Sequence, residues 1–222
     1  AKASGVTGCL VTGTSVAESQ QALALCQQFP NYLACTTGVH PHDADNVAHD
    51  YLEQLTLLSQ SPFVKAIGEC GLDFNRNYST PENQQKVFAE QVRLACDLNM
   101  PLFLHQRDAF DAWLEILQPA INHVPAMVAH CFTGNLSELK TCLQHGMYIG
   151  ITGWVCDERR GQELREIVKH IQLERLLIET DAPYLTPCTI RPRPKSSRNE
   201  PSYLPYVVQT LAEQMGCSLD DV

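Results

Sequence analysis

Short apolar runs alternate along the chain with segments whose apolar residues recur at helical spacing. Most of the runs are nearly continuous in apolar or small residues, which is typical of strands buried on both faces of a parallel sheet. We predict strands at residues 6–13, 32–39, 63–68, 101–104, 126–129, 147–152 and 176–180. This alternation of strands and helices predicts an α/β fold.

Helix signals lie between these strands. Ser15 with Glu18, and Ser79 with Glu82, have the spacing of capping boxes, and Gly146 is a predicted helix terminator. Seven strands are one fewer than a closed eight-stranded barrel needs. We therefore expect a (β/α)8 TIM barrel that lacks its first strand and last helix. Residues 1–222 are then one domain, incomplete at both ends.

The chain is acidic and has a globular composition. Its 16 Lys and Arg against 25 Asp and Glu give a formal charge of −9, and 44% of its 222 residues are hydrophobic. An acidic balance argues against broad, non-specific nucleic-acid binding. No 18-residue apolar run is visible, so we expect no membrane partner. Ten scattered Cys without a CxxC pair indicate reduced thiols and a cytoplasmic location.

Residues that can bind metals or transfer protons follow five of the predicted strands. They are His40, Glu69, His105, His130 and Asp181. Because the carboxyl ends of parallel barrel strands open into one mouth, we expect these side chains to converge. A single His at a strand end is more often structural, but five such positions together favour a site.

Three imidazoles and two carboxylates suit a divalent metal centre. Any of the five could bind the metal, and Glu69 could bridge two ions. Glu69 and Asp181 are also the predicted catalytic residues, because Asp181 can accept a proton from the attacking water. Imidazole and carboxylate ligands suit Zn²⁺, Mn²⁺ or iron, and carboxylates with water molecules suit Mg²⁺.

Other polar residues near these strands have two interpretations each. His42 either serves a turn or supports a ligand, or it binds the metal directly. Asp73 serves either a turn or the site, and Arg107 either begins a helix or binds a phosphate. Arg198 belongs to a basic stretch that is either a solvated loop or a contact for a nucleic-acid backbone. The aromatic residues that follow strands either pack or stack on a base: Phe74, Tyr78, Phe132 and Trp154.

Several motifs together resemble the TatD family of metal-dependent nucleases. They are GVHPHD (38–43), GECGLDF (68–74), LHQRDA (104–109), AHCFTG (129–134), GITGW (150–154), ETDAPYL (179–185) and SRNEP (197–201). Cys70 and the segment GWVCDERRG (153–161) resemble bacterial members in particular. The resemblance covers nearly the whole chain and implies a TIM barrel of the metal-dependent hydrolase type.

The resemblance also implies an activity. It indicates a Mg²⁺- or Mn²⁺-dependent deoxyribonuclease that degrades single-stranded DNA from 3′ to 5′, with RNA as a second substrate. Glu69, His105, His130 and Asp181 match the family's metal-site positions, His40 and His42 its pocket-lining turn, and Arg198 a loop near the site. We expect a monomer. The alternative is an amidohydrolase or lactonase acting on a small molecule. Many such enzymes bridge two metals with a carboxylated lysine, whereas Lys65 lies four residues before Glu69, at the wrong depth.

Overall fold

The computed structural model describes residues 1–222 and divides into two compact units. One unit is Gly8–Val128, and the other combines Ala1–Thr7 with Ala129–Val222. All seven predicted strands are present. The single-domain organisation stays a prediction.

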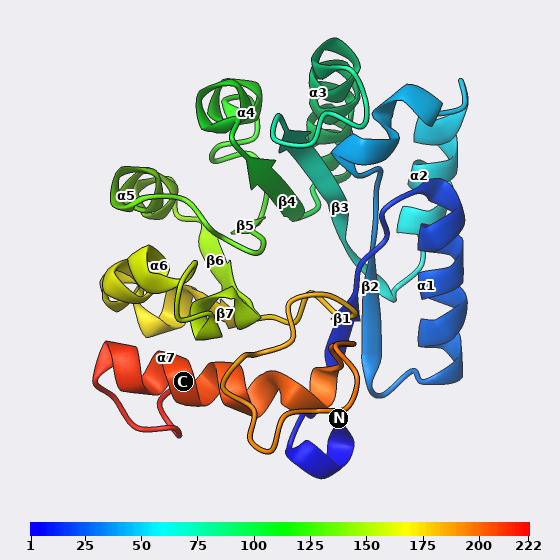
Figure 1. Cartoon of the computed structure of the whole chain (residues 1–222). Helices are drawn as coiled ribbons and strands as arrows, with labels where there is room; N and C mark the ends of the chain where they lie inside the picture. The colour runs from blue at the N-terminus through cyan, green and yellow to red at the C-terminus, as the bar shows by residue number, and fades with distance from the viewer. The chain divides into compact units, whose positions relative to one another are not determined.

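The Gly8–Val128 unit alternates strands and helices. Its strands are β1 (Cys9–Val11), β2 (Leu33–Thr37), β3 (Val64–Asp73), β4 (Leu102–Arg107) and, at the boundary of the unit, β5 (Met127–Ala129). Its helices are α1 (Val16–Gln28), the 3-10 helix η2 (Pro41–Asn46), α2 (Tyr51–Ser59), α3 (Pro81–Leu98) and α4 (Phe110–Leu117). Strands β1 to β4 pair in parallel and in chain order. Helices α1, α2 and α3 pack along them (Figure 1).

The second unit holds the remaining elements. They are η1 (Lys2–Ser4), α5 (Leu136–Gln144), β6 (Tyr148–Ile151), η3 (Gly153–Cys156), α6 (Gln162–Ile167), η4 (Val168–His170), η5 (Leu173–Arg175), β7 (Leu176–Ile178), η6 (Pro201–Tyr203) and α7 (Leu204–Met215). Strands β6 and β7 are parallel. Helix α7 packs against β7 and α6, so a helix again covers the strand pair.

Two glycines in β3 let this strand lie close to β4. Its pairing with β4 shifts register between Ile67 and Cys70, and Gly68 and Gly71 have φ values of +143° and +151°. A Cβ on Gly68 would lie 2.1 Å from the Phe103 carbonyl oxygen. A Cβ on Gly71 would lie 1.8 Å from the carbonyl oxygen of His105. Only glycine permits both the backbone conformation and this close approach.

Apolar side chains between strands and helices form the core of the Gly8–Val128 unit. One cluster joins Val39, Ala44, Tyr51, Leu55 and Val87, and a second joins Ala22, Cys26, Cys35 and Val64. All ten cysteines are free thiols, and five of them are buried. Burial raises the pKa of the Cys35 thiol to about 12, with Cys26 adding to the effect. These thiols therefore pack as small apolar groups.

One helix start differs from the prediction. Helix α3 is capped by Thr80, which accepts the Asn83 N–H, because buried Ser79 instead donates to the His42 carbonyl. Helix α5 has a complete capping box of Asn135 with Glu138. Ser15 caps α1 as predicted.

Helix α2 carried no clear start signal and was not predicted; its Asp50 cap makes no side-chain bond. The segment after Ser218 forms turns.

Candidate metal centre

Three polar side chains converge in the Gly8–Val128 unit. His40 follows β2, Glu69 lies within β3 and His105 lies within β4. Glu69 Oε1 lies 2.9 Å from His105 Nδ1 and 3.5 Å from His40 Nε2, and the two imidazole nitrogens are 3.3 Å apart. We refer to His40, Glu69 and His105 as the His–Glu–His group.

Neighbouring backbone positions each member of the group. Glu69 is only 8% exposed, and its N–H donates to the Gly13 carbonyl. The His40 N–H donates to the Thr14 carbonyl. His105 pairs in register with Gly71, whose missing side chain lets β3 and β4 approach at this point. The carboxylate is thus fixed between strands rather than carried on a loop.

The spacing of the group suits a divalent ion. Nitrogen and oxygen ligands about 2.0–2.2 Å from one ion, at right to tetrahedral angles, lie about 3.0–3.5 Å apart. The three separations agree with that range. His105 Nε2 is buried without a hydrogen-bond partner at normal distance. Its nearest carboxylate oxygen is Asp73 Oδ2, at 3.6 Å. An Nε2–H directed at Asp73 leaves the Nδ1 lone pair facing Glu69, as a metal-binding imidazole requires.

His40 has a different tautomeric preference. Its Nδ1 accepts the His42 N–H at 3.2 Å, which favours the neutral ring with its proton on Nε2. Burial lowers the pKa of His40 to about 3, although the Glu69 carboxylate opposes this. The ring is therefore neutral at pH 7. In this state His40 Nε2–H is a hydrogen-bond donor that points toward Glu69 and His105, which both present acceptors.

Asp73 joins the group to a second histidine. Its Oδ2 lies 2.7 Å from His42 Nε2, and its Oδ1 accepts the N–H groups of Asn75 and Arg76. Burial alone raises the pKa of Asp73, but contacts from His105, the Arg76 N–H and His42 outweigh it and hold the pKa well below its usual range.

The same contacts act on His105 in the opposite sense. Burial disfavours the charged imidazole, yet Asp73 and Glu69 raise its pKa above the ordinary value.

The second unit contains its own cluster. His130 Nδ1 lies 2.9 Å from Glu179 Oε2, and His130 Nε2 lies 3.7 Å from Asp181 Oδ1. Glu179 also accepts the Cys131 N–H. A Cβ on Gly150 would lie 2.0 Å from this carboxylate, so the glycine makes room for it. Glu179 thus holds one ring nitrogen of His130 while the other faces Asp181.

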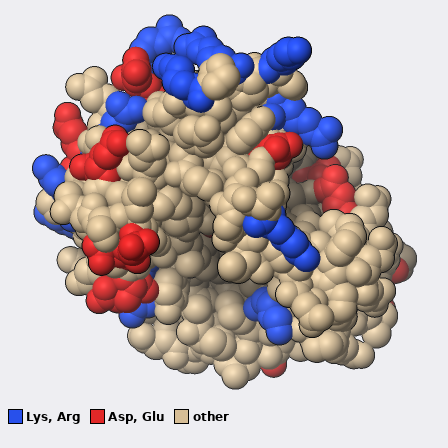
Figure 2. All heavy atoms as spheres, turned by 90° about the horizontal axis from the view of Figure 1, so that it is seen from below, with Lys and Arg blue, Asp and Glu red and all other residues tan.

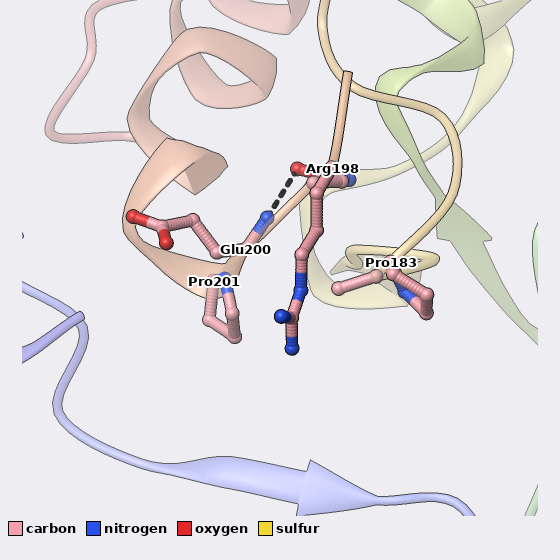
Figure 3. Close-up of a pocket in the computed structure, with 6 residues that line it drawn as sticks. Pro183, Arg198, Glu200 and Pro201 are labelled. Carbon is pink, nitrogen blue, oxygen red and sulfur yellow. Dashed lines mark hydrogen bonds between the residues drawn. The ribbon is translucent and has the colours of Figure 1, made fainter. Parts of the chain in front are cut away.

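A shallow pocket in the second unit is lined by residues that follow Asp181 in the sequence. It measures about 410 Å³ and is lined by Ala182, Pro183, Arg198, Asn199, Glu200 and Pro201. Figure 3 shows the Arg198 side chain extending between Pro183 and Pro201, while the Glu200 N–H donates to Asn199 Oδ1. The exposed guanidinium of Arg198 is therefore available to an anion.

Basic side chains in the second unit are partly neutralised. Arg160 pairs with Asp157 at 2.8 Å and lies over the Trp154 ring. Figure 2 shows acidic side chains among the basic ones on the face in view. This agrees with the acidic total and does not indicate a broad basic surface there.

The structure revises several placements of the predicted site residues. Glu69, Asp73, His105 and Arg107 lie within strands rather than after them, because β3 and β4 continue beyond the register shift. Arg107 is the last residue of β4 and pairs with Asp73, so it does not begin a helix. His40, expected to line the pocket, has its Nε2 within 3.5 Å of two predicted ligands, Glu69 and His105.

Glu179 was missed by the sequence reasoning. The available signal was its position two residues before Asp181, since alternate residues of an extended segment share a face.

A parallel α/β fold with imidazoles and carboxylates gathered at its strands is typical of metal-dependent hydrolases of the TIM-barrel type. The sequence model of the TatD related DNase family matches residues 1–222. The chain belongs to this family.

Known relatives support this membership. The chain is 54% identical over 216 residues to "3'-5' ssDNA/RNA exonuclease TatD" of Pectobacterium parmentieri, covering 97% of this chain and 83% of that protein. It is 53% identical over 212 residues to the Escherichia coli K12 protein of the same name, covering 96% and 81%. The crystal structure of YJJV, a TatD homologue from Escherichia coli K12, superposes with a TM-score of 0.87 at 28% identity, covering 98% and 82%. The predicted TIM-barrel fold class is confirmed by this similarity. No helix is both long and apolar enough to cross a membrane.

Proposed function

We propose that this protein is a metal-dependent nuclease that hydrolyses phosphodiester bonds of single-stranded DNA and RNA, releasing nucleotides from the 3′ end. The observation that carries the proposal is the His–Glu–His group, whose nitrogen and oxygen atoms have the spacing of a divalent metal site. Membership of the TatD related DNase family and relatives named as 3′–5′ exonucleases support the same activity.

The residues of the group have distinct proposed roles. Glu69 and His105 hold the ion, because Oε1 of Glu69 and Nδ1 of His105 present lone pairs to the same point. Neutral His40 donates from Nε2 to a phosphate oxygen. Asp73 orients His105 from the other side of the ring. A divalent ion held there would neutralise charge on the phosphate and lower the pKa of a water molecule.

For His130 and Asp181 we propose the roles that the family resemblance implies. His130 binds metal through Nε2, since its Nδ1 faces Glu179. Asp181 accepts the proton of the attacking water; its side chain is 36% exposed, so solvent reaches it. Arg198, exposed beside the pocket, binds a backbone phosphate. We propose Mg²⁺ as the resident ion, but the imidazole ligand His105 also suits Mn²⁺ and Zn²⁺.

The test uses the full chain with 3′-labelled and 5′-labelled single-stranded DNA and RNA. Mg²⁺, Mn²⁺, Zn²⁺ or EDTA is added, and Glu69→Gln is compared with Glu53→Gln, an exposed carboxylate on α2. We expect stepwise shortening from the 3′ end that needs metal. Glu69→Gln should lower the rate by about 100-fold or more, and Glu53→Gln should leave it unchanged. Metal-dependent cleavage that survives Glu69→Gln would overturn the proposal.

The position of Lys65 does not fit the carboxylated lysine that many amidohydrolases use to bridge two metals. The lysine nearest to Glu69 in sequence, Lys65, is exposed on β3, so it does not supply a buried bridging carbamate. Turnover of cyclic amides or lactones far above that of DNA would nevertheless restore the amidohydrolase alternative. The predicted monomeric state is measured separately by light scattering.

A further inference from the structure

One loop beside the His–Glu–His group carries an aromatic ring in solvent. Residues 74–80 join β3 to α3, and Tyr78 in this loop is 68% exposed. Its ring meets the His42 ring edge-on, with centroids 4.7 Å apart and an interplanar angle of 75°. One side of the phenol ring is therefore fixed against the protein while most of its surface meets water.

Hydrogen bonds hold this loop in place. Asp73 Oδ1 accepts the Asn75 N–H at 3.1 Å and the Arg76 N–H at 2.9 Å. Asn75 Nδ2 donates to Asp108 Oδ2 at 2.7 Å. Buried Ser79 donates to the His42 carbonyl at 2.8 Å. The loop is thus tied at both ends to Asp73 and His42, which themselves bond to each other.

The same contacts place the ring close to the reacting group. The His42 ring meets the His40 ring edge-on, with centroids 4.3 Å apart, and lies 6.3 Å from the His105 ring. Only one imidazole therefore separates Tyr78 from the group that we propose to hold the metal. The distance from Tyr78 to the group is therefore on the scale of a single nucleotide, whose base and phosphate are joined through one sugar.

Tyr78 differs in this respect from the other aromatic residues considered for stacking. Phe132 is 6% exposed, and Phe74 is half-buried. Trp154 is half-buried and already has Arg160 over its ring. Tyr78 alone among the four is exposed. Arg76, two residues earlier, is exposed without an ion pair and adds a positive charge to the same loop.

We propose that Tyr78 is a stacking platform for the base of the nucleotide next to the scissile phosphate. The proposal rests on the proposed nuclease function and names how the substrate is recognised. Stacking on an aromatic face is sequence-tolerant, because every base has a π-face. A base inside a duplex must first leave its neighbour and its partner. The platform would therefore favour single strands without selecting a sequence.

The experiment crosses two protein changes with two substrate changes. Tyr78→Ala and Tyr78→Phe are compared on a single-stranded DNA oligonucleotide and on the same strand lacking its two 3′-terminal bases. The control is Phe29→Ala. Phe29 is an aromatic residue that is 49% exposed, and it lies at the end of α1, before β2 begins. The readouts are kcat/KM with metal and, in EDTA, the Kd from fluorescence anisotropy.

We expect Tyr78→Ala to lower kcat/KM on the intact strand by about 5- to 150-fold. On the abasic strand the loss should shrink to less than about 2-fold, because no base remains to stack. Tyr78→Phe, which keeps the ring, should stay close to wild type, and Phe29→Ala should behave as wild type on both strands. Circular dichroism confirms that each variant is folded.

The outcomes separate this proposal from the proposed function. An equal loss for Tyr78→Ala on intact and abasic strands would overturn stacking while leaving the nuclease intact, as would wild-type behaviour of Tyr78→Ala. If the wild-type chain cleaves no nucleic acid, the nuclease function fails. The Kd values then still decide whether Tyr78 stacks a base: a base-dependent loss of affinity supports it, and an unchanged Kd refutes it.

Discussion

Replacing Asp73 by Asn tests how one buried carboxylate organises the site. The substitution keeps the shape of the side chain and removes its charge. Asp73 is 1% exposed and accepts from His42 Nε2 at 2.7 Å and from two loop N–H groups at 2.9 and 3.1 Å. An asparagine that keeps its oxygen toward the loop turns its NH₂ toward His42 and His105, where two donors then face each other.

The expected loss of stability follows from these contacts. A hydrogen bond to a charged group contributes about 1.5–3 kcal/mol, and a neutral one about 0.5–1.5 kcal/mol. Losing the His42 bond and weakening the two loop bonds should lower the free energy of unfolding by about 3 kcal/mol at pH 7. The same change should weaken Mn²⁺ binding by about 10- to 100-fold, because His105 loses the carboxylate that orients it.

The pH dependence provides a second check. The folded state lowers the pKa of Asp73, so its charge stabilises the fold above the unfolded pKa of about 3.9 and this contribution is lost as the pH falls below that value. Each pH unit below it removes about 1.36 kcal/mol. The difference between wild type and Asp73→Asn should therefore narrow by about 1.2 kcal/mol between pH 7 and pH 3.

Urea titrations in EDTA, followed by tryptophan fluorescence, measure this difference. The chain has two tryptophans, and Trp113 is buried in the unit that contains Asp73. A Trp154→Phe background makes the signal report on that unit alone. A loss below about 1 kcal/mol at pH 7 would refute the assigned bonds. An unchanged difference at pH 3 would show that the charge of Asp73 is not what stabilises the fold.

Three further changes test other parts of the structure. Gly150→Ala should destabilise the fold by about 1–3 kcal/mol in thermal denaturation, because its Cβ would lie 2.0 Å from the Glu179 carboxylate; wild-type stability would contradict this packing. Glu179→Gln should lower kcat/KM by about 10- to 100-fold in protein shown by circular dichroism to be folded, and full activity would show that His130 needs no such support. Ser79→Ala should cost about 1–3 kcal/mol in urea denaturation, since its buried hydroxyl bonds to two backbone groups, whereas an exposed cap would cost less.

The order of elements was readable from the sequence because burial leaves a local pattern. A parallel strand covered on both faces must be apolar at nearly every position, and β3 shows this with only Lys65 exposed. Glu69 and His105 were identifiable for the same reason, since each interrupts an apolar run with a group that needs a partner.

Contacts between residues that lie far apart in the sequence leave weaker signals in it. Thr80 rather than Ser79 caps α3 because Ser79 finds partners in the loop that holds His42. The continuation of β3 to Asp73 depends on the approach of β4 at two glycines. Neither choice is visible in local spacing, because each is decided by a segment more than 25 residues away.

The α/β architecture and the residue types that can bind a metal follow from the chain alone, because periodicity and chemical type are properties of the sequence. The contacts among those residues depend on the folded backbone. The fold places His40 next to Glu69 and His105, Asp73 next to His42, and Glu179 next to His130. Such pairings depend on hydrogen-bond geometry within a few ångströms, which only the folded backbone sets.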